Sequence, residues 1–523
     1  MKSKVVSAST AVNVIKDGDT VATGGFVGSG VPEQLVVALE HRFLTTNTPR
    51  RLSLLYAAGQ GDGKERGLNH LGHEGLIARV IGGHWGLVPK LQKLANDNKI
   101  IAYNWPQGII STMFRDTAAK KPRTISAIGL GTFVDPRNGG GKLNKATTED
   151  LVTLIHFDGK EYLAYRTLPV NIGLLRGTTA DPDGNITMEK EALTLEMLAI
   201  AMAVRNSGGK VIVQVERIAE LGSLSSRQVK IPGIFVDYVV VAEPENHWQT
   251  FGVQYNPAYS GEIKVPVQSI APMAMGHRKI IARRAALELQ AGVIANLGIG
   301  APEGVASVVN EEGLLNQFVL TTESGVIGGI PAGGLNFGVG VNAVAIIDQT
   351  YQFDYYDGGG LDITFLGMAQ VDWKGNVNVS KFGTRLAGAG GFINISQTAK
   401  TVVFVGSFTA SGLKTVVEDR HLRIAQEGST RKFVSGEVEH ITFSGNYAMK
   451  RGQKVLYVTE RCVFQLTSRG MELIEIAPGV DLLFDILDHM GFEPIIPREP
   501  KLMDKRIFRP ELMGFGNPSD IRN

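Results

Sequence analysis

Short apolar runs recur along the chain, and each is followed directly by a polar residue or a glycine. Residues 99–103, 210–215, 318–322 and 401–405 are examples, rich in Val, Ile, Leu and Phe. Runs of this length and composition predict buried β-strands. Segments with helix start signals lie between them, and strands that alternate with helices favour mostly parallel sheets. The pattern therefore predicts an α/β fold.

Two pairs of similar segments occur in the same order, which indicates an internal duplication. Residues 16–33 and 290–303 both read as a strand, a glycine turn, and then Gly-x-Pro-Glu at the start of an apolar helix. Proline at the first helical position, with an acidic residue beside it, favours such a start. Residues 181–186 and 372–377 both have the form Asp-x-x-Gly-Asn followed by an aliphatic residue, which is typical of a turn.

The duplication predicts two related, open, mostly parallel α/β domains. The first spans about residues 1–255 and the second about residues 276–523, and the proline-spaced segment around Pro257, Pro266 and Pro272 joins them. At 523 residues the chain is too long for one compact core, which independently favours more than one domain.

Composition and charge exclude several classes of protein. Hydrophobic residues make up 43% of the chain and charged residues 20%, as in an ordinary globular enzyme. The net charge of +2 gives no field that would attract nucleic acid or a membrane surface. Cys462 is the only cysteine, so a disulfide within the chain and a cysteine-based zinc site are both excluded.

The sequence also predicts where the protein is found. The N-terminal residues contain no apolar core of a signal peptide. No apolar run approaches the ~18 residues that are needed to span a bilayer. Together with the single cysteine, these features predict a soluble, cytoplasmic protein.

Residues 322–334 carry the most informative candidate for chemistry. Glu323 follows the predicted strand 318–322 directly and lies at the mouth of a glycine-rich loop. A strand end holds its side chain rigidly, while glycine, which lacks Cβ, lets a ligand approach the neighbouring backbone. Glu323 is therefore a candidate nucleophile, although a carboxylate that caps the turn or pairs with an arginine fits the same position.

Other motifs point less clearly to a function. The glycine-rich loops 24–32 and 298–304 lack the spacing of a dinucleotide-binding fingerprint, and the chain contains no Gly-x-x-x-x-Gly-Lys-Ser/Thr phosphate loop. His70, His73 and His84 could suggest a metal site. A glycine between the first two disfavours a helix that presents both rings on one face, so a solvated or hydrogen-bonded pair is the favoured interpretation.

Two further segments could contact a reacting group. Asn104 follows the predicted strand 99–103, where it could donate to a developing oxyanion or belong to a simple surface turn. Gly388, Gly390 and Gly391 lie in a third glycine loop. That loop could let the polar chain of a ligand lie along the backbone, or it could merely connect two strands tightly.

Taken together, these segments resemble the family I CoA-transferases. The first signature of that family has Asp-Gly, three aliphatic residues, Gly-Gly-Phe, three residues and Gly-x-Pro, and it is found at residues 17–32 with Thr23 as the one departure. The second signature is Ser-Glu-Asn-Gly in many members. Here it is Thr322–Gly325 with Ser324 in place of Asn, which is similar to the single-chain acetate and propionate CoA-transferases. The resemblance covers almost the whole chain.

The resemblance implies an enzyme that moves CoA between a short-chain acyl-CoA and a short-chain carboxylic acid. The implied mechanism is ping-pong, with Glu323 carrying a glutamyl-CoA thioester. Gln107 and the backbone around Gly388 are implied as oxyanion donors, and Gly388, Gly390 and Gly391 are expected to flank the pantetheine of CoA. The resemblance implies no metal and no cofactor, because the CoA thioester is itself a substrate.

The resemblance also implies the partners and leaves two alternatives. The expected partners are acyl-CoA and short-chain carboxylates, without nucleic acid or membrane, and the expected assembly is a homotetramer. A CoA hydrolase would resolve the same glutamyl intermediate with water, and a non-enzymatic acyl-CoA sensor could use the same fold. The preferred acid stays open, since one methylene group is worth only about 1–3 kcal/mol in a pocket.

Overall fold

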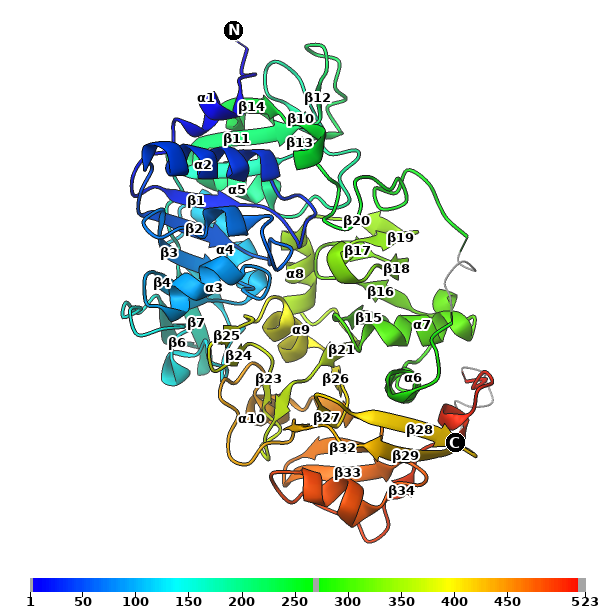
Figure 1. Ribbon diagram of the computed structural model, residues 1–523. Helices are drawn as coiled ribbons and strands as arrows, with labels where there is room; N and C mark the ends of the chain where they lie inside the picture. Colours follow the sequence, from blue (N-terminus) through cyan, green and yellow to red (C-terminus); the bar gives the residue numbers. More distant parts are fainter. Residues whose placement is uncertain (1–2, 267–271, 516–523) are drawn as a thin grey trace.

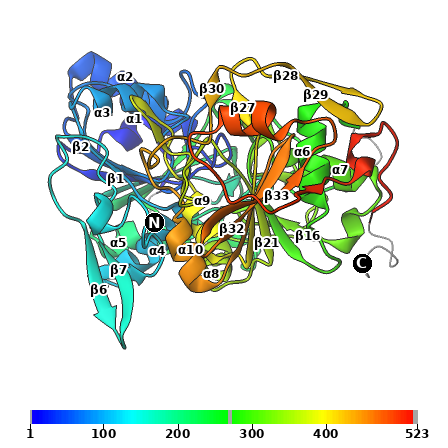
Figure 2. The same ribbon diagram turned by 90° about the horizontal axis from the view of Figure 1, so that it is seen from below.

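The computed structural model of the protein describes residues 3–266 and 272–515 (Figure 1). It is a mixed α/β structure with one large sheet in each half of the chain, which confirms the predicted fold class. Figure 2 shows the same two halves from below.

Parallel strands alone make up the large sheet of the first half. They are β1 (Thr20–Thr23), β2 (Leu52–Tyr56), β3 (Ile77–Gly82), β4 (Ile101–Asn104), β8 (Ile172–Arg176), β11 (Lys210–Val215) and β14 (Tyr238–Val241). Their order in the sheet is β14-β11-β8-β1-β2-β3-β4, and every neighbouring pair is parallel. Both faces are covered, which explains why these strands read as continuous apolar runs.

Helices pack on both faces of this sheet. One face carries α1 (Ala8–Val12), α2 (Glu33–Thr46) and α3 (Pro89–Asn96), and the other carries α4 (Gln107–Ala118) and α5 (Met197–Asn206). Two smaller sheets lie beside it. One is antiparallel and is made of β5 (Arg123–Ser126), β6 (Val152–Phe157) and β7 (Lys160–Arg166). The other is mixed and is made of β9 (Thr179–Ala180), β10 (Ile186–Thr187), β12 (Arg217–Ile218) and β13 (Val229–Ile231), with β12 parallel to β9.

The large sheet of the second half has a parallel centre and antiparallel additions at its sides. Its strands are β15 (Ile294–Leu297), β16 (Val319–Thr321), β17 (Val326–Ile327), β20 (Ala345–Ile346), β21 (Ile363–Gly367), β26 (Thr401–Val405), β31 (Lys454–Val458), β32 (Cys462–Thr467), β33 (Gly470–Ile476) and β34 (Lys501–Leu502). Helices α6 (His277–Ala286) and α7 (Glu303–Glu311) cover one face, and α8 (Gln349–Asp357) and α9 (Phe392–Thr398) cover the other.

The internal duplication is confirmed by strand order. The series β14-β11-β8-β1-β2 of the first sheet corresponds to β31-β26-β21-β15-β16 of the second. The helices α2 and α7 follow β1 and β15, but they begin at Glu33 and Glu303, one residue after the prolines that were expected to occupy the first helical position.

The duplicated turns also form the same hydrogen bonds. The backbone N–H of Asn185 donates to Asp181 Oδ1 at 2.9 Å, and that of Asn376 donates to Asp372 Oδ1 at 3.0 Å. The two asparagine Nδ2 atoms donate to the other carboxylate oxygen at 2.8 and 3.0 Å. The two turns therefore have the same local structure at corresponding places in the two halves, in agreement with the shared strand order.

The two halves meet through helices α4 and α8, and Figure 1 shows α8 and α9 between the two sheets. The hydrophobic core around α4 and α5 includes Phe337, Ala389 and Ile393 from the second half, so apolar packing continues across the junction. The domain bounds 1–255 and 276–523 stay a prediction. Within the described ranges, no helix is long and apolar enough to cross a membrane.

Candidate active site

Glu323 lies in a tight turn just after β16. The N–H of Thr322 donates to Val326 O at 3.0 Å, and the N–H of Gly325 donates to Thr322 O at 3.2 Å. Gly325 has φ +116°, and a Cβ there would lie 2.0 Å from Ile347 O. Only glycine fits this position, so the Glu-x-Gly pattern follows from the geometry of the turn.

The neighbours of Glu323 are fixed by short hydroxyl contacts. The Thr322 and Ser324 hydroxyl oxygens lie 2.8 Å apart, and both are within hydrogen-bond reach of Gly338 O, so their two hydrogens are shared among these contacts. Ser324 is therefore an internal anchor of the turn, with its side chain buried and directed away from the cavity wall that Glu323 forms.

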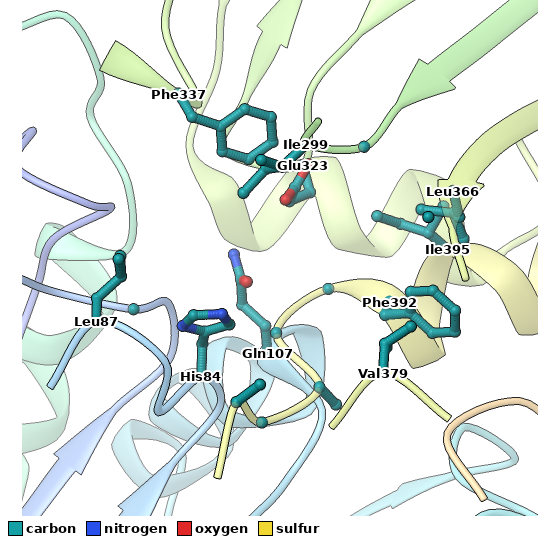
Figure 3. A pocket seen from close by; sticks show the side chains of 18 of the residues that line it. His84, Leu87, Gln107, Ile299, Glu323, Phe337, Leu366, Val379, Phe392 and Ile395 are labelled. Atoms are coloured by element: carbon teal, nitrogen blue, oxygen red, sulfur yellow. The ribbon is translucent and has the colours of Figure 1, made fainter. Parts of the chain in front are cut away.

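Glu323 faces a cavity of about 220 Å³ between the two halves. The structure brings Glu323, Gln107, Gly388, Gly390 and Gly391 together around this cavity, although Gln107 comes from the first half. In Figure 3, Glu323 and Gln107 point toward one another across it. All five candidate site residues from the sequence thus line one space.

Burial controls the chemistry of Glu323. Its side chain is 8% exposed, and its Oε2 atom has no hydrogen-bond partner among residues 3–266 and 272–515. Burial raises the pKa of Glu323 to about 7, against smaller opposing effects of its own backbone N–H and of Asn296. A buried carboxyl that lines a cavity with one unpaired oxygen is a candidate reacting group.

Gln107 is the first residue of α4 and is held at both ends. Its backbone N–H donates to Gly390 O at 2.9 Å, and its Nε2 donates to Gln349 Oε1 at 2.9 Å. Since an amide nitrogen carries two hydrogens, one N–H of Gln107 is left for the cavity. This geometry suits a hydrogen-bond donor to a developing oxyanion.

The backbone of the glycine loop is mostly engaged within the protein. The N–H of Gly388 donates to Ser380 O at 2.9 Å, that of Ala389 to Asn104 Oδ1 at 2.9 Å, and that of Gly390 to Gly83 O at 2.7 Å. These three N–H groups are therefore already paired in the free enzyme, and the expectation that the backbone around Gly388 supplies an oxyanion donor stays a prediction.

The glycines of the loop are required by close approach. Gly388 has φ +78°, and a Cβ there would lie 2.8 Å from the backbone nitrogen of Trp85 in the first half. A Cβ at Gly391 would lie 3.2 Å from Glu323 Cγ. The loop thus packs against the first half at Gly388 and against the Glu323 side chain at Gly391.

Asn104 fulfils neither of the two expected roles. It is fully buried at the end of β4, so it does not belong to a surface turn. Its Nδ2 donates to the carbonyl oxygens of Gly82 and Gly83 at 2.8 and 2.6 Å, and its Oδ1 accepts from Ala389. With its polar atoms occupied, Asn104 joins the two halves instead of contacting a reacting group.

The histidines separate into two environments. His70 and His73 both hydrogen-bond to Glu40, at 2.5 and 2.6 Å, and His70 also contacts Glu33. This confirms the interpretation as a hydrogen-bonded pair. Within the part of the chain that the structure describes, no group of three or more His, Cys, Asp or Glu residues could hold a metal ion.

His84 is a cavity residue that the sequence reasoning missed. Figure 3 shows its ring beside Gln107, and its Nδ1 is buried without a hydrogen-bond partner in the described ranges. Burial lowers the pKa of His84 to about 4, so the ring is neutral at physiological pH. Its position directly after β3 and Gly83 was an available signal, because it repeats the strand-end placement of Glu323.

Comparison with known proteins places this site in a family. A family model described as Coenzyme A transferase matches residues 5–242. The chain is 49% identical to the caffeate CoA-transferase of Acetobacterium woodii over 97% of both chains. It is 46% identical to the acetate CoA-transferase YdiF of Escherichia coli (strain K12), over 98% of this chain and 97% of that one. The chain therefore belongs to the coenzyme A transferase family.

Solved structures agree with the sequence comparison. The acyl-CoA transferase YdiF of E. coli O157:H7, described as a thioester complex with CoA, matches with a TM-score of 0.93 and 46% identity over 98% of each chain. The apoenzyme of the same protein matches with a TM-score of 0.94 over the same shares. The fold, the fused halves and the enzyme class predicted from the sequence are confirmed: the protein is a CoA-transferase.

Proposed function

We propose that this enzyme transfers CoA between a short-chain acyl-CoA and a short-chain carboxylic acid, with Glu323 as the nucleophile. The observation that carries the proposal is the placement of Glu323, a buried carboxyl with an unpaired oxygen at the cavity between the halves. The thioester complex with CoA described for the E. coli relative agrees with a covalent route.

In the first half-reaction, a carboxylate oxygen of Glu323 attacks the carbonyl carbon of the acyl thioester. The C–S bond breaks, CoA leaves as a thiolate, and a mixed anhydride joins the acyl group to Glu323. The thiolate then attacks the glutamyl carbonyl carbon and expels the first acid as a carboxylate. Glu323 is left as a glutamyl-CoA thioester.

In the second half-reaction, the incoming carboxylate attacks the glutamyl thioester and expels the CoA thiolate. The thiolate attacks the acyl carbonyl of the new anhydride, which releases the new acyl-CoA and restores Glu323. Nucleophiles and leaving groups are anions throughout, so the proposed route uses no metal, redox cofactor or external base.

The reactivity of Glu323 must come from its surroundings, because a carboxylate is a weak nucleophile toward a thioester. Fixed orientation can supply roughly 7–11 kcal/mol in favourable cases. The rigid turn at Gly325 and the close contact at Gly391 provide such orientation. Gln107, through its remaining N–H, would stabilise the oxyanion, and one such donor is worth roughly 2.7–4 kcal/mol.

The acid is proposed to be short because two aromatic rings occupy part of the wall of the cavity that Glu323 lines. Phe26 and Phe337 line the cavity with ring centroids 5.7 Å apart. Acetate, propionate, butyrate and caffeate, supplied separately as acceptors for one acyl-CoA, test this assignment. Higher kcat/KM for caffeate than for acetate would contradict it.

Trapping of the intermediate tests the nucleophile directly. The protein is incubated with acyl-CoA, treated with borohydride, digested, and analysed by mass spectrometry. Reduction of a glutamyl thioester converts the Glu323 side chain to a primary alcohol, and Glu323→Gln should give no such product. Modification at another residue, or none during turnover, would refute the proposed mechanism.

An acceptor experiment separates transfer from hydrolysis. With propionyl-CoA as donor, acetate should accelerate propionate release and acetyl-CoA should accumulate. A homotetrameric assembly and a cytoplasmic location stay predictions, which light scattering of the purified enzyme and cell fractionation would test.

A further inference from the structure

We propose that Glu196, a buried residue outside the cavity, is a positioning residue that fixes the amide of Gln107 through Gln349. Neither Glu196 nor Gln349 lines the cavity. The proposal deepens the function proposed above, because it rests on Gln107 as the donor to the oxyanion.

The three side chains form a continuous series of hydrogen bonds. Gln107 Nε2 donates to Gln349 Oε1 at 2.9 Å, and Gln349 Nε2 donates to Glu196 Oε2 at 2.8 Å. All three side chains are at most 2% exposed. The series passes from the first half at Gln107 to α8 of the second half, and returns to the first half at Glu196.

The chemistry of the last residue sets the direction of the whole series. An oxygen of Glu196 accepts, so Gln349 must turn its amide nitrogen toward Glu196 and its oxygen toward Gln107. Gln107 must then turn its own nitrogen toward Gln349. One N–H of Gln107 Nε2 is thereby fixed on Gln349, which holds the second N–H in one orientation as the donor to the oxyanion.

The segment that carries Glu196 is built to hold α8. Thr194 Oγ1 donates to Asp348 Oδ1 at 2.6 Å, and the N–H of Gln349 donates to Leu195 O at 3.1 Å. Leu195 has φ +54°, a conformation that is unfavourable for a residue with a branched side chain. Three consecutive residues thus bind the start of α8, and a strained backbone directs Glu196 toward Gln349.

The buried carboxyl of Glu196 favours its neutral form, which needs no counter-charge. Burial raises the pKa of its carboxyl to about 8, and the nearby Asp348 adds to the rise. A neutral carboxyl accepts from Gln349 Nε2 through its carbonyl oxygen and keeps its O–H as a donor. The observed series therefore uses an acceptor at this position and not a negative charge, which separates the effects of two substitutions.

The experiment compares Glu196→Leu, which removes the acceptor, with Glu196→Gln, which keeps one. Glu196→Leu should lower kcat by about tenfold or more, because the donor is no longer aligned. Its KM for acyl-CoA should change by less than about twofold. Glu196→Gln should stay within about threefold of the wild type in kcat, and equal losses in both variants would overturn the acceptor role.

Gln349→Met provides the second variant, since it breaks the same series at its middle and preserves the volume of the side chain. It should lower kcat by about tenfold or more, as expected for Glu196→Leu, and it therefore tests the series even if Glu196→Leu does not fold. Thr194→Val is the comparison variant, because it removes the adjacent bond to Asp348 and leaves the series itself intact. Its loss in kcat should be clearly smaller than that of Gln349→Met, and an equal loss would overturn the proposal.

A double-mutant cycle distinguishes positioning from a general structural role. In a Gln107→Ala background, Glu196→Leu should lower kcat by less than about twofold further. A fully additive loss would overturn the proposal. If Gln107→Ala leaves kcat unchanged, the oxyanion role within the proposed function fails as well. If Gln107→Ala lowers kcat while Glu196→Leu and Gln349→Met do not, only the positioning inference fails.

Discussion

Glu323 combines two requirements that oppose each other in the free enzyme. The attacking form is the carboxylate, whereas burial favours the neutral acid and raises its pKa to about 7. The side chain lines the cavity, while its Oε2 atom is buried and unpaired, so the carboxylate is poorly solvated in the free enzyme. The residue is therefore expected to lower stability in exchange for reactivity.

The stability cost predicts that Glu323→Gln stabilises the free enzyme, most strongly at alkaline pH. The folded pKa of about 7 lies above the unfolded value of 4.5, so the folded state binds more protons between these values and stability falls as pH rises. The amide variant avoids this loss, which amounts to about 3 kcal/mol at most.

Denaturant unfolding at pH 5 and pH 8 measures this effect. The advantage of Glu323→Gln in unfolding free energy should be larger at pH 8. A larger advantage at pH 5 would show that the pKa of Glu323 is not raised in the folded enzyme.

The same pKa predicts how activity depends on pH. Since kcat/KM reports ionisations of the free enzyme, its logarithm should rise as Glu323 deprotonates and should level off above pH about 7. Initial rates at low acyl-CoA concentration over pH 5 to 9 test this. Gln107→Ala should show the same inflection at a lower rate, and an inflection near pH 4.5 would contradict the prediction.

At the scale of elements, the loop that precedes α9 sets the position of the nucleophile. Gly391 has an ordinary φ of −79°, so a substitution there acts by contact and not by backbone strain. A Cβ would lie 3.2 Å from Glu323 Cγ and 3.3 Å from Phe353 Cζ. Phe353 is fully buried on α8, whereas Glu323 and Ile395, whose Cδ1 would also lie 3.2 Å from that Cβ, both line the cavity and are the neighbours that can move.

Gly391→Ala is therefore predicted to lower kcat/KM by about tenfold, since a shift of a few tenths of an ångström misplaces the carboxylate. The midpoint of thermal unfolding should change by only a few degrees. Gly276→Ala is the matched control, because a Cβ there would meet no atom within 4 Å. A fall in unfolding temperature without a fall in kcat/KM would show that the loop supports only the fold.

The elements also show what the sequence could predict. Apolar runs marked the strands, and the residue after a strand end marked Glu323, because both signals are local. His84 carried the same local signal but was grouped with His70 and His73 by residue type. Gln349 and Glu196 carried no such signal, since their bond joins residues 153 positions apart and Gln107 lies 242 positions from Gln349.

Across the whole molecule, the cavity exists only while the two halves stay joined. The backbone of the second half's glycine loop bonds to the first half at several points, including Gly390 N to Gly83 O at 2.7 Å and Trp85 N to Ala387 O at 2.7 Å. Arg115 and Asp354 form an ion pair between α4 and α8 at the same junction. Stability and catalysis are consequently coupled through the junction.

Asn104→Ala tests this coupling, because Asn104 bonds to Gly82, Gly83 and Ala389 in a fully buried position. Its removal leaves the buried N–H of Ala389 unpaired, which costs about 1–3 kcal/mol, and takes one of the bonds from each of Gly82 O and Gly83 O. The unfolding free energy should fall by about 3 kcal/mol, and kcat should fall with it, since the loop that supports Glu323 loses its anchor to the first half.

Asn96→Ala is the matched control for Asn104→Ala. Asn96 Nδ2 also donates across the two halves, to Thr384 O at 2.6 Å, but this bond is exposed to solvent. Water can replace it, so the free energy of unfolding should change by less than about 0.5 kcal/mol and kcat should not change. Denaturant unfolding and initial rates measure both variants. Equal losses in the two variants would mean that every hydrogen bond between the halves contributes alike. The buried bonds of Asn104, which connect the loop to the end of β4, would then have no special role.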